Sequence, residues 1–145
     1  MHNGRFLRPA LILLVGALGL AGAMRPASAD ISLEGGALVT KGGASGAAAA
    51  SIGLFTLPAV PLSGNLTVAD SGGGFATTFD ARLALGPTTL GAGLGFGSLG
   101  NTKSTSSVYD AVLAERIFEH TELETRLYFG PNRPSSLFAG LRLSF

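Results

Sequence analysis

Side chains that could catalyse a reaction or bind a metal are few in this sequence of 145 residues. It contains no cysteine, and its two histidines are His2 and His120. One histidine in the body of the chain, without cysteine, does not make a metal site. Ser106 and Ser107 are candidate nucleophiles, but no base lies near them in the sequence. We therefore expect no enzyme activity, no metal and no cofactor, and we expect His120 to lie in a surface turn.

A glycine-rich string occupies residues 91–97 and reads Gly-Ala-Gly-Leu-Gly-Phe-Gly. It contains a Gly-x-Gly pattern like that of phosphate-binding loops, but its period is two, and neither a P-loop lysine nor a helix start follows. The string is typical of a strand with one face free of side chains. A nucleotide site is therefore not expected.

Charged residues form the main chemical pattern, because nine of them share one face of segments in which apolar and polar residues alternate. These residues are Glu34, Asp80, Arg82, Asp110, Arg116, Glu122, Glu124, Arg126 and Arg142. Five acids and four arginines can neutralise one another, as buried charges require. In a soluble sandwich the same face would instead be exposed and its charges solvated.

The first 29 residues have the order of a secretory signal peptide. Arg5 and Arg8 precede a small and apolar run at 10–24, and Ala27-Ser-Ala29 precedes Asp30. The alternative is a transmembrane anchor, but the run is short against the roughly 20 residues that a spanning helix needs. We expect cleavage after Ala29 and a mature domain at 30–145. Without the three arginines of the first 29 residues, Asp and Glu outnumber Lys and Arg. That charge balance is not a nucleic-acid footprint.

Eight segments of the mature chain alternate with period two and are predicted as strands. They cover residues 31–39, 47–57, 62–69, 75–85, 88–98, 107–117, 121–129 and 136–145. Between them, short turns at 58–61, 86–87 and 118–120 alternate with longer connections at 40–46, 70–74, 99–106 and 130–135. This asymmetry is typical of membrane barrels, for which eight is the smallest common strand number. The sequence therefore predicts an all-β, eight-stranded antiparallel up-and-down transmembrane β-barrel.

An eight-stranded barrel is just wide enough for side chains to fill its interior. We expect the glycines of 88–98 to leave room for long arginines, and an interior belt that plugs the barrel. The predicted belt contains Glu34, Asp80, Arg82, Glu124, Arg126 and Arg142. Pairing about the turns predicts that Arg82 lies opposite Gly91 and that Glu124 lies opposite Arg142.

The last segment carries a family resemblance. Its apolar side consists of Leu137, Ala139, Leu141, Leu143 and Phe145. With the signal-like N-terminus and eight alternating strands, the mature chain resembles the small eight-stranded outer-membrane barrels, of the OmpA-like and OmpX-like type. Gly140, Leu143 and Phe145 match that family's recognition signal for the barrel-assembly machinery, whereas Phe138 stands where a polar residue is expected. The resemblance implies the outer membrane of a Gram-negative bacterium, with outer-membrane lipid and the assembly machinery as partners.

A structural or surface-interaction protein is the function expected for such a plugged barrel. The alternatives are a narrow solute channel and a soluble, periplasmic lipocalin-like binding barrel. Lys41, Lys103 and Arg133 outnumber Asp70 in the predicted outer loops, a balance that could favour the phosphates of lipopolysaccharide. No nucleic-acid partner is expected, and the oligomeric state is left open.

Overall fold

The computed structural model describes residues 30–57, 59–99 and 104–145. The predicted signal peptide and Lys103 lie outside the described residues. The eight strands are β1 (Ile31–Thr40), β2 (Gly43–Thr56), β3 (Leu62–Asp70), β4 (Phe75–Leu85), β5 (Thr88–Gly97), β6 (Ser106–Phe118), β7 (Thr121–Phe129) and β8 (Ser136–Ser144). No helix within the described residues is long and apolar enough to cross a membrane.

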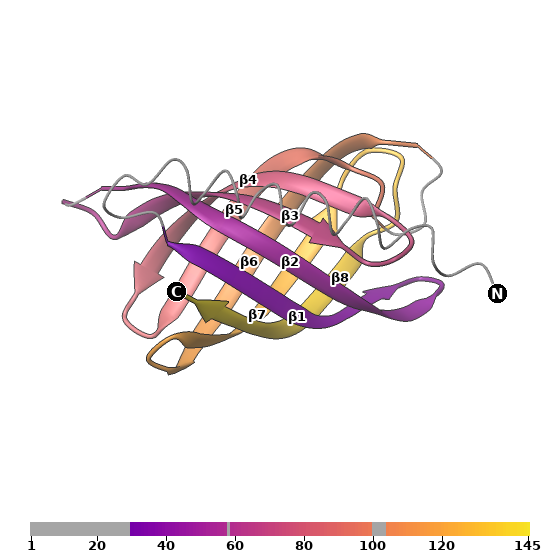
Figure 1. The fold of residues 1–145 in the computed structure, drawn as a ribbon. Coiled ribbons are helices and arrows are strands. Elements are labelled where there is room, and N and C mark those ends of the chain that lie inside the picture. Colours follow the sequence, from indigo (N-terminus) through magenta and orange to yellow (C-terminus); the bar gives the residue numbers. More distant parts are fainter. Residues whose placement is uncertain (1–29, 58, 100–103) are drawn as a thin grey trace.

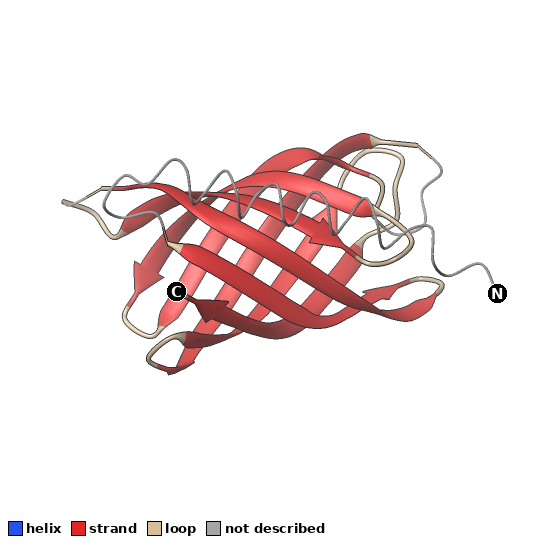
Figure 2. Ribbon diagram, in the orientation of Figure 1, coloured by secondary structure: helices blue, strands red, loops and turns tan. Residues whose placement is uncertain are grey.

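The strands form a closed barrel in which each strand pairs antiparallel with the next along the chain. β8 then pairs with β1, so the sheet has no free edge (Figure 1). Strands make up almost the whole ribbon of the described residues, and short loops join them at the two ends of the barrel (Figure 2). The predicted eight-stranded, up-and-down antiparallel barrel is confirmed.

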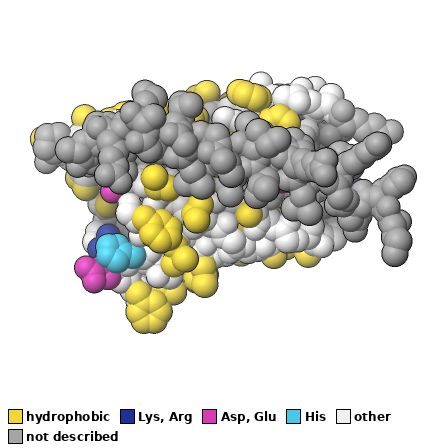
Figure 3. All heavy atoms as spheres, in the orientation of Figure 1, with side chains coloured by type: hydrophobic (Ala, Val, Ile, Leu, Met, Phe, Trp, Pro, Cys, Tyr) yellow, Lys and Arg dark blue, Asp and Glu magenta, His cyan; other side chains and the backbone are white. Residues whose placement is uncertain are grey.

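The two faces of the wall differ as the alternation predicts. Large apolar side chains of the outward face are exposed, with Leu94 at 63%, Phe96 at 53% and Leu113 at 51%. On the part of the wall visible in Figure 3, apolar side chains appear at several separate places, and the few visible charged ones gather at one end. Most residues of opposite parity point into the barrel, where the charged groups lie. The barrel therefore has an apolar exterior and a partly ionic interior.

One connection is shorter than expected. β2 begins at Gly43, not at residue 47, so only Lys41 and Gly42 separate it from β1. Gly43 has φ 133°, and the Thr40 hydroxyl donates to the Gly43 carbonyl oxygen and accepts from the Gly42 amide. Residues 98–105 and 130–135 form the longest connections and lie at this end, but the connection 71–74 at this end is shorter than the connection 57–61 at the opposite end. The predicted asymmetry of lengths therefore holds only in part. We call this end the loop end, and the opposite one the turn end.

Strand register agrees with one of the two predictions. Arg82 lies opposite Gly91, as expected. Glu124, however, pairs with Gly140, and Arg142 pairs with Glu122. The pairing of β7 with β8 is symmetric about Asn132, which lies in the connection between them and adopts a left-handed φ of 57°. A centre one residue earlier than predicted moves every cross-strand partner by two positions, and this explains the difference.

Candidate functional site: an ionic network inside the barrel

Seven charged side chains meet inside the barrel, each at most 8% exposed. This group, called the ionic network below, consists of Glu34 from β1, Asp80 and Arg82 from β4, Asp110 from β6, Glu124 and Arg126 from β7, and Arg142 from β8. It includes all six members of the predicted belt. Four acids and three arginines thus lie almost out of contact with solvent inside the barrel.

Arg126 is at the centre of the ionic network and is fully buried. Its Nη1 atom donates to Asp80 Oδ2 at 3.1 Å and to Asp110 Oδ2 at 3.0 Å. Its Nη2 and Nε atoms donate to Glu124 Oε1 at 2.8 Å and 3.1 Å. A planar guanidinium with fixed donor directions suits this arrangement, in which one cation joins three carboxylates on β4, β6 and β7.

The other two arginines extend the ionic network towards β1. Arg82 donates from Nη1 to Glu124 Oε2 at 2.9 Å and lies 3.9 Å from Glu34. Arg142 donates from Nη2 to the Ser32 hydroxyl at 2.8 Å, and its Nε lies 3.8 Å from Glu34. Through these contacts the ionic network connects β1 with β4, β7 and β8.

Hydroxyl groups of β2 and β3 complete the polar interior. Ser51 donates to Glu34 Oε1 at 3.1 Å, and Thr67 donates to Asp80 Oδ2 at 2.8 Å. The two hydroxyls also lie 3.1 Å apart, within hydrogen-bond distance. Sequence reasoning missed both residues, although each has the inward parity of its strand.

Two predicted members of the charged set lie outside the buried group. Glu122 is half-buried at the edge of the ionic network, where it accepts from Arg142 Nη1 at 3.4 Å. Arg116 is exposed, which corrects the prediction of an interior position. The reason is its place near the turn end, where the pairing of β6 with β7 shifts register between Arg116 and Phe118. The alternation of side chains along β6 predicted which face Arg116 is on, but not that this position lies too close to the end of the barrel to be buried.

The glycines of β5 have three different neighbours. A Cβ at Gly91 would lie 3.2 Å from Arg82 Cγ, as expected if glycine makes room for an arginine. A Cβ at Gly93 would instead overlap carboxylate oxygens. At Gly95 and Gly97 it would overlap backbone carbonyl oxygens of β4. The predicted role in accommodating arginine thus applies to Gly91, and the others allow close approach of carboxylates or of the neighbouring strand.

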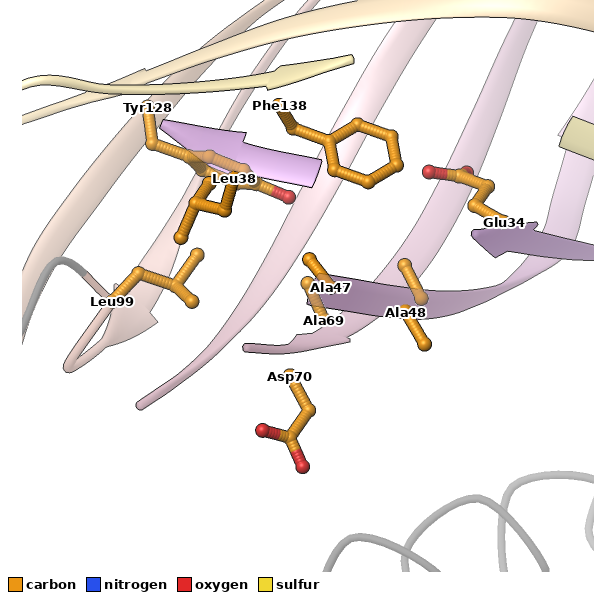
Figure 4. Close-up of a pocket in the computed structure, with 10 residues that line it drawn as sticks. Glu34, Leu38, Ala47, Ala48, Ala69, Asp70, Leu99, Tyr128 and Phe138 are labelled. Atoms are coloured by element: carbon orange, nitrogen blue, oxygen red, sulfur yellow. The ribbon is translucent and has the colours of Figure 1, made fainter. Parts of the chain in front are cut away.

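The loop end of the interior is apolar, which the sequence reasoning did not foresee. A buried apolar cluster there consists of Leu38, Ala49, Ala69, Ala76, Leu99, Val108, Tyr128 and Phe138. Leu38, Tyr128 and Phe138 lie close together beside a cavity of only about 10 Å³, enough for about one water molecule (Figure 4). The interior is therefore filled in two layers, apolar at the loop end and ionic towards the turn end.

The three residues predicted as an assembly signal lie at the seam between β8 and β1. Leu143 and Phe145 are exposed, at 45% and 73%. Gly140 faces inward opposite Gly36, and a Cβ at Gly140 would lie 2.7 Å from Phe138 Cζ. Phe138 therefore covers Gly140 inside the barrel. This position explains how an aromatic residue is accommodated where a polar one was expected.

Candidate catalytic groups are occupied or isolated. His120 lies in the turn between β6 and β7, exposed and 3.8 Å from the exposed Glu119. The Ser106 hydroxyl accepts from Arg133 Nη2 at 2.7 Å, and that nitrogen also donates to the Gly97 carbonyl at 2.6 Å. Partial burial lowers the pKa of Arg133. Within the described residues, no group of three or more His, Cys, Asp or Glu side chains could hold a metal ion.

Comparison with known proteins supports the fold. No protein-family model matches the sequence, and no match is found among curated proteins. Among solved structures, a de novo designed transmembrane β-barrel has a TM-score of 0.60 at 9% identity, covering 84% of this chain and 100% of its own. The designed protein TMB2.3 has a TM-score of 0.62 at 12% identity, covering 83% and 97%. Ail, the attachment invasion locus protein of Yersinia pestis, has a TM-score of 0.43 at 14% identity, covering 81% and 97%.

Proposed function

We propose that the chain is a membrane-spanning β-barrel of a Gram-negative outer membrane, with a structural or surface-interaction role and no catalytic activity. One observation carries the proposal: the outward face of a closed barrel is apolar and the charges are inside. A barrel in water would need the reverse arrangement, because buried charges are stabilised only by pairing while exposed apolar area is unfavourable.

The ends of the wall support a position in a bilayer. The rings of Tyr109 and Phe129 are tilted by 37° with centroids 5.8 Å apart near the loop end, and Phe75 and Phe96 make an edge contact at 6.4 Å. Aromatic residues at the borders of an apolar band are typical of outer-membrane barrels. Glu115 is an outward-facing acid near the turn end, where it accepts from the Thr88 hydroxyl at 2.6 Å. A charge near the interface costs only about 0–1 kcal/mol.

A plugged barrel is better supported than a channel, because two packed layers fill the interior. Apolar side chains fill the loop end, and ion pairs fill the middle of the barrel. A narrow solute channel remains the second candidate, since charged interiors are also found in porins. Planar-bilayer recording separates the two candidates. Steady single-channel current that changes in Arg126→Met would refute the plugged form.

Lipid is the partner that this proposal requires. The family resemblance of Gly140, Leu143 and Phe145 makes the barrel-assembly machinery a further proposed partner. A contact with lipopolysaccharide phosphates has less support than the sequence suggested, because Arg133 donates to the Gly97 carbonyl of β5 and to the Ser106 hydroxyl of β6. Lys41 is exposed and is the described cation that this contact would use. The OmpA-like or OmpX-like subtype is likewise part of the proposal.

A matched pair of arginine substitutions tests the lipid contact. Ala111 is exposed in the middle of β6, and Ile117 is exposed near its turn end. In lipid, Ala111→Arg should destabilise the barrel by about 2–4 kcal/mol and Ile117→Arg by about 0–1 kcal/mol. The readouts are unfolding in phospholipid vesicles, fractionation with outer membranes, and the shift in gel mobility on heating. Equal, small effects of both substitutions, together with a protein that stays soluble without detergent, would contradict the proposal.

A further inference from the structure

Two carboxyl groups converge on the empty face of one glycine. Gly93 of β5 lies between Asp80 of β4 and Asp110 of β6, its direct cross-strand partners on either side. All three positions face inward. A Cβ on Gly93 would overlap both Asp80 Oδ1 and Asp110 Oδ1. The space of the missing side chain is therefore occupied by two carboxyl oxygens from neighbouring strands.

These two oxygens have no hydrogen-bond donor. Both Oδ2 atoms accept from Arg126 Nη1, and Asp80 Oδ2 also accepts from Thr67. Asp80 Oδ1 and Asp110 Oδ1 are buried and unpartnered. Two ionised carboxylates in such contact repel each other, and a proton shared between them removes the repulsion and satisfies both oxygens.

The ionic network also contains one positive charge fewer than is needed to neutralise its carboxylates. Four carboxyl groups face three guanidiniums, and arginine does not lose its proton in proteins. Glu34 also has an unpartnered oxygen, but all three arginines lie within 4 Å of its other oxygen. Asp110 pairs with Arg126 Nη1 at 3.0 Å, and Asp80 pairs with the same nitrogen at 3.1 Å and with Arg82 Nη2 at 3.7 Å, so the two carboxyl groups share one close guanidinium nitrogen. The additional charge is therefore needed at the aspartate pair.

We propose that Asp80 and Asp110 form a proton-binding site, with one proton held in an O–H···O hydrogen bond between their Oδ1 atoms over Gly93. A metal ion does not fit, because the described residues include no group of three ligands of the required kinds. The titratable and charged groups of the surrounding strands are Glu34 of β1, Arg82 of β4, Glu122, Glu124, Arg126 and Tyr128 of β7, and Arg142 of β8. The site does not depend on what the outer face contacts.

Infrared spectroscopy of the folded full-length barrel in detergent micelles tests the site directly. The spectrum should contain the C=O stretching band of a protonated carboxylic acid. The band should shift when the aspartate side-chain carboxyl carbon is ¹³C-labelled, and it should be lost in Asp110→Asn. A wild-type spectrum without the band, or a band that does not respond to aspartate labelling, would overturn the proposal without any variant having to fold.

A second measurement compares two isosteric substitutions. In Asp110→Asn the amide N–H can take the place of the shared proton, so the unfolding equilibrium constant should change by less than about tenfold. In Glu124→Gln a carboxylate that accepts from both Arg82 and Arg126 is lost, and the constant should rise by about tenfold to a hundredfold. An Asp110→Asn barrel as destabilised as Glu124→Gln would contradict a protonated pair.

Discussion

Replacing Arg126 with methionine should be the most damaging single change within the ionic network. Four hydrogen bonds from its guanidinium end on Asp80, Asp110 and Glu124. Methionine keeps much of the side-chain volume, so the loss is mainly that of the central cation and not of packing. The three carboxyl groups stay buried, each at most 2% exposed, inside a sheet that closes around the barrel.

The size of the effect follows from the state of the groups left behind. Removing one partner of a buried ion pair costs about 3–5 kcal/mol, because the remaining charge is uncompensated. At 1.4 kcal/mol for each factor of ten, the unfolding equilibrium constant should rise by roughly a hundredfold to several thousandfold. Arg82 and Arg142 keep contacts with Glu124 and Glu34, so we expect an effect in the lower part of this range.

Equilibrium unfolding in urea, with the barrel in phospholipid vesicles, measures the difference. The sequence contains no tryptophan, so far-ultraviolet circular dichroism and the heat-dependent gel mobility are the suitable signals. Arg116→Met is the matched control, because Arg116 is exposed near the turn end and its replacement should change stability by about 0.5 kcal/mol or less. If Arg126→Met and Arg116→Met unfold at the same urea concentration, the central cation of the ionic network does not stabilise the barrel.

Three further substitutions test other parts of the interior. Gly93→Ala should destabilise the barrel by about 1–3 kcal/mol in urea unfolding, because the added Cβ would overlap two carboxyl oxygens. Gly35→Ala is the control and should be close to neutral, because no atom lies within 4 Å of the added Cβ. Equal effects of the two substitutions would refute the steric argument. Phe138→Ala should cost about 3–5 kcal/mol in the same assay, since the side chain is 3% exposed in the apolar cluster, and a loss below 1 kcal/mol would mean that the cluster collapses to fill the space. Arg133→Gln should speed protease cleavage of the loop between β7 and β8 while leaving the urea midpoint of unfolding unchanged. An unchanged cleavage rate would show that the hydrogen bonds of Arg133 to Gly97 and Ser106 do not order the loop.

The strands and their faces could be predicted because side-chain direction in a strand has period two. Once 75–85 is extended, Phe79 and Asp80 must lie on opposite sides, and closure of the barrel makes one side the interior. The predicted pairing of Arg82 with Gly91 succeeded because the turn between β4 and β5 has only two residues. The longer connection between β7 and β8 allows more than one centre, and there the predicted partner of Glu124 was wrong by two residues.

Depth inside the barrel is a different matter, because parity does not determine it. Glu34 and Leu38 have the same parity on β1, yet Glu34 lies in the ionic network and Leu38 in the apolar cluster. The stagger between neighbouring strands accumulates around the barrel, and closure through β8 decides which residues of distant strands reach the same level. Arg126 and Phe138 show the result: they are direct cross-strand partners, but the guanidinium reaches the carboxylates while the ring packs with Leu38. The boundary between the two layers therefore lies within a single pair of residues, and the direction in which each side chain leans along the barrel sets it.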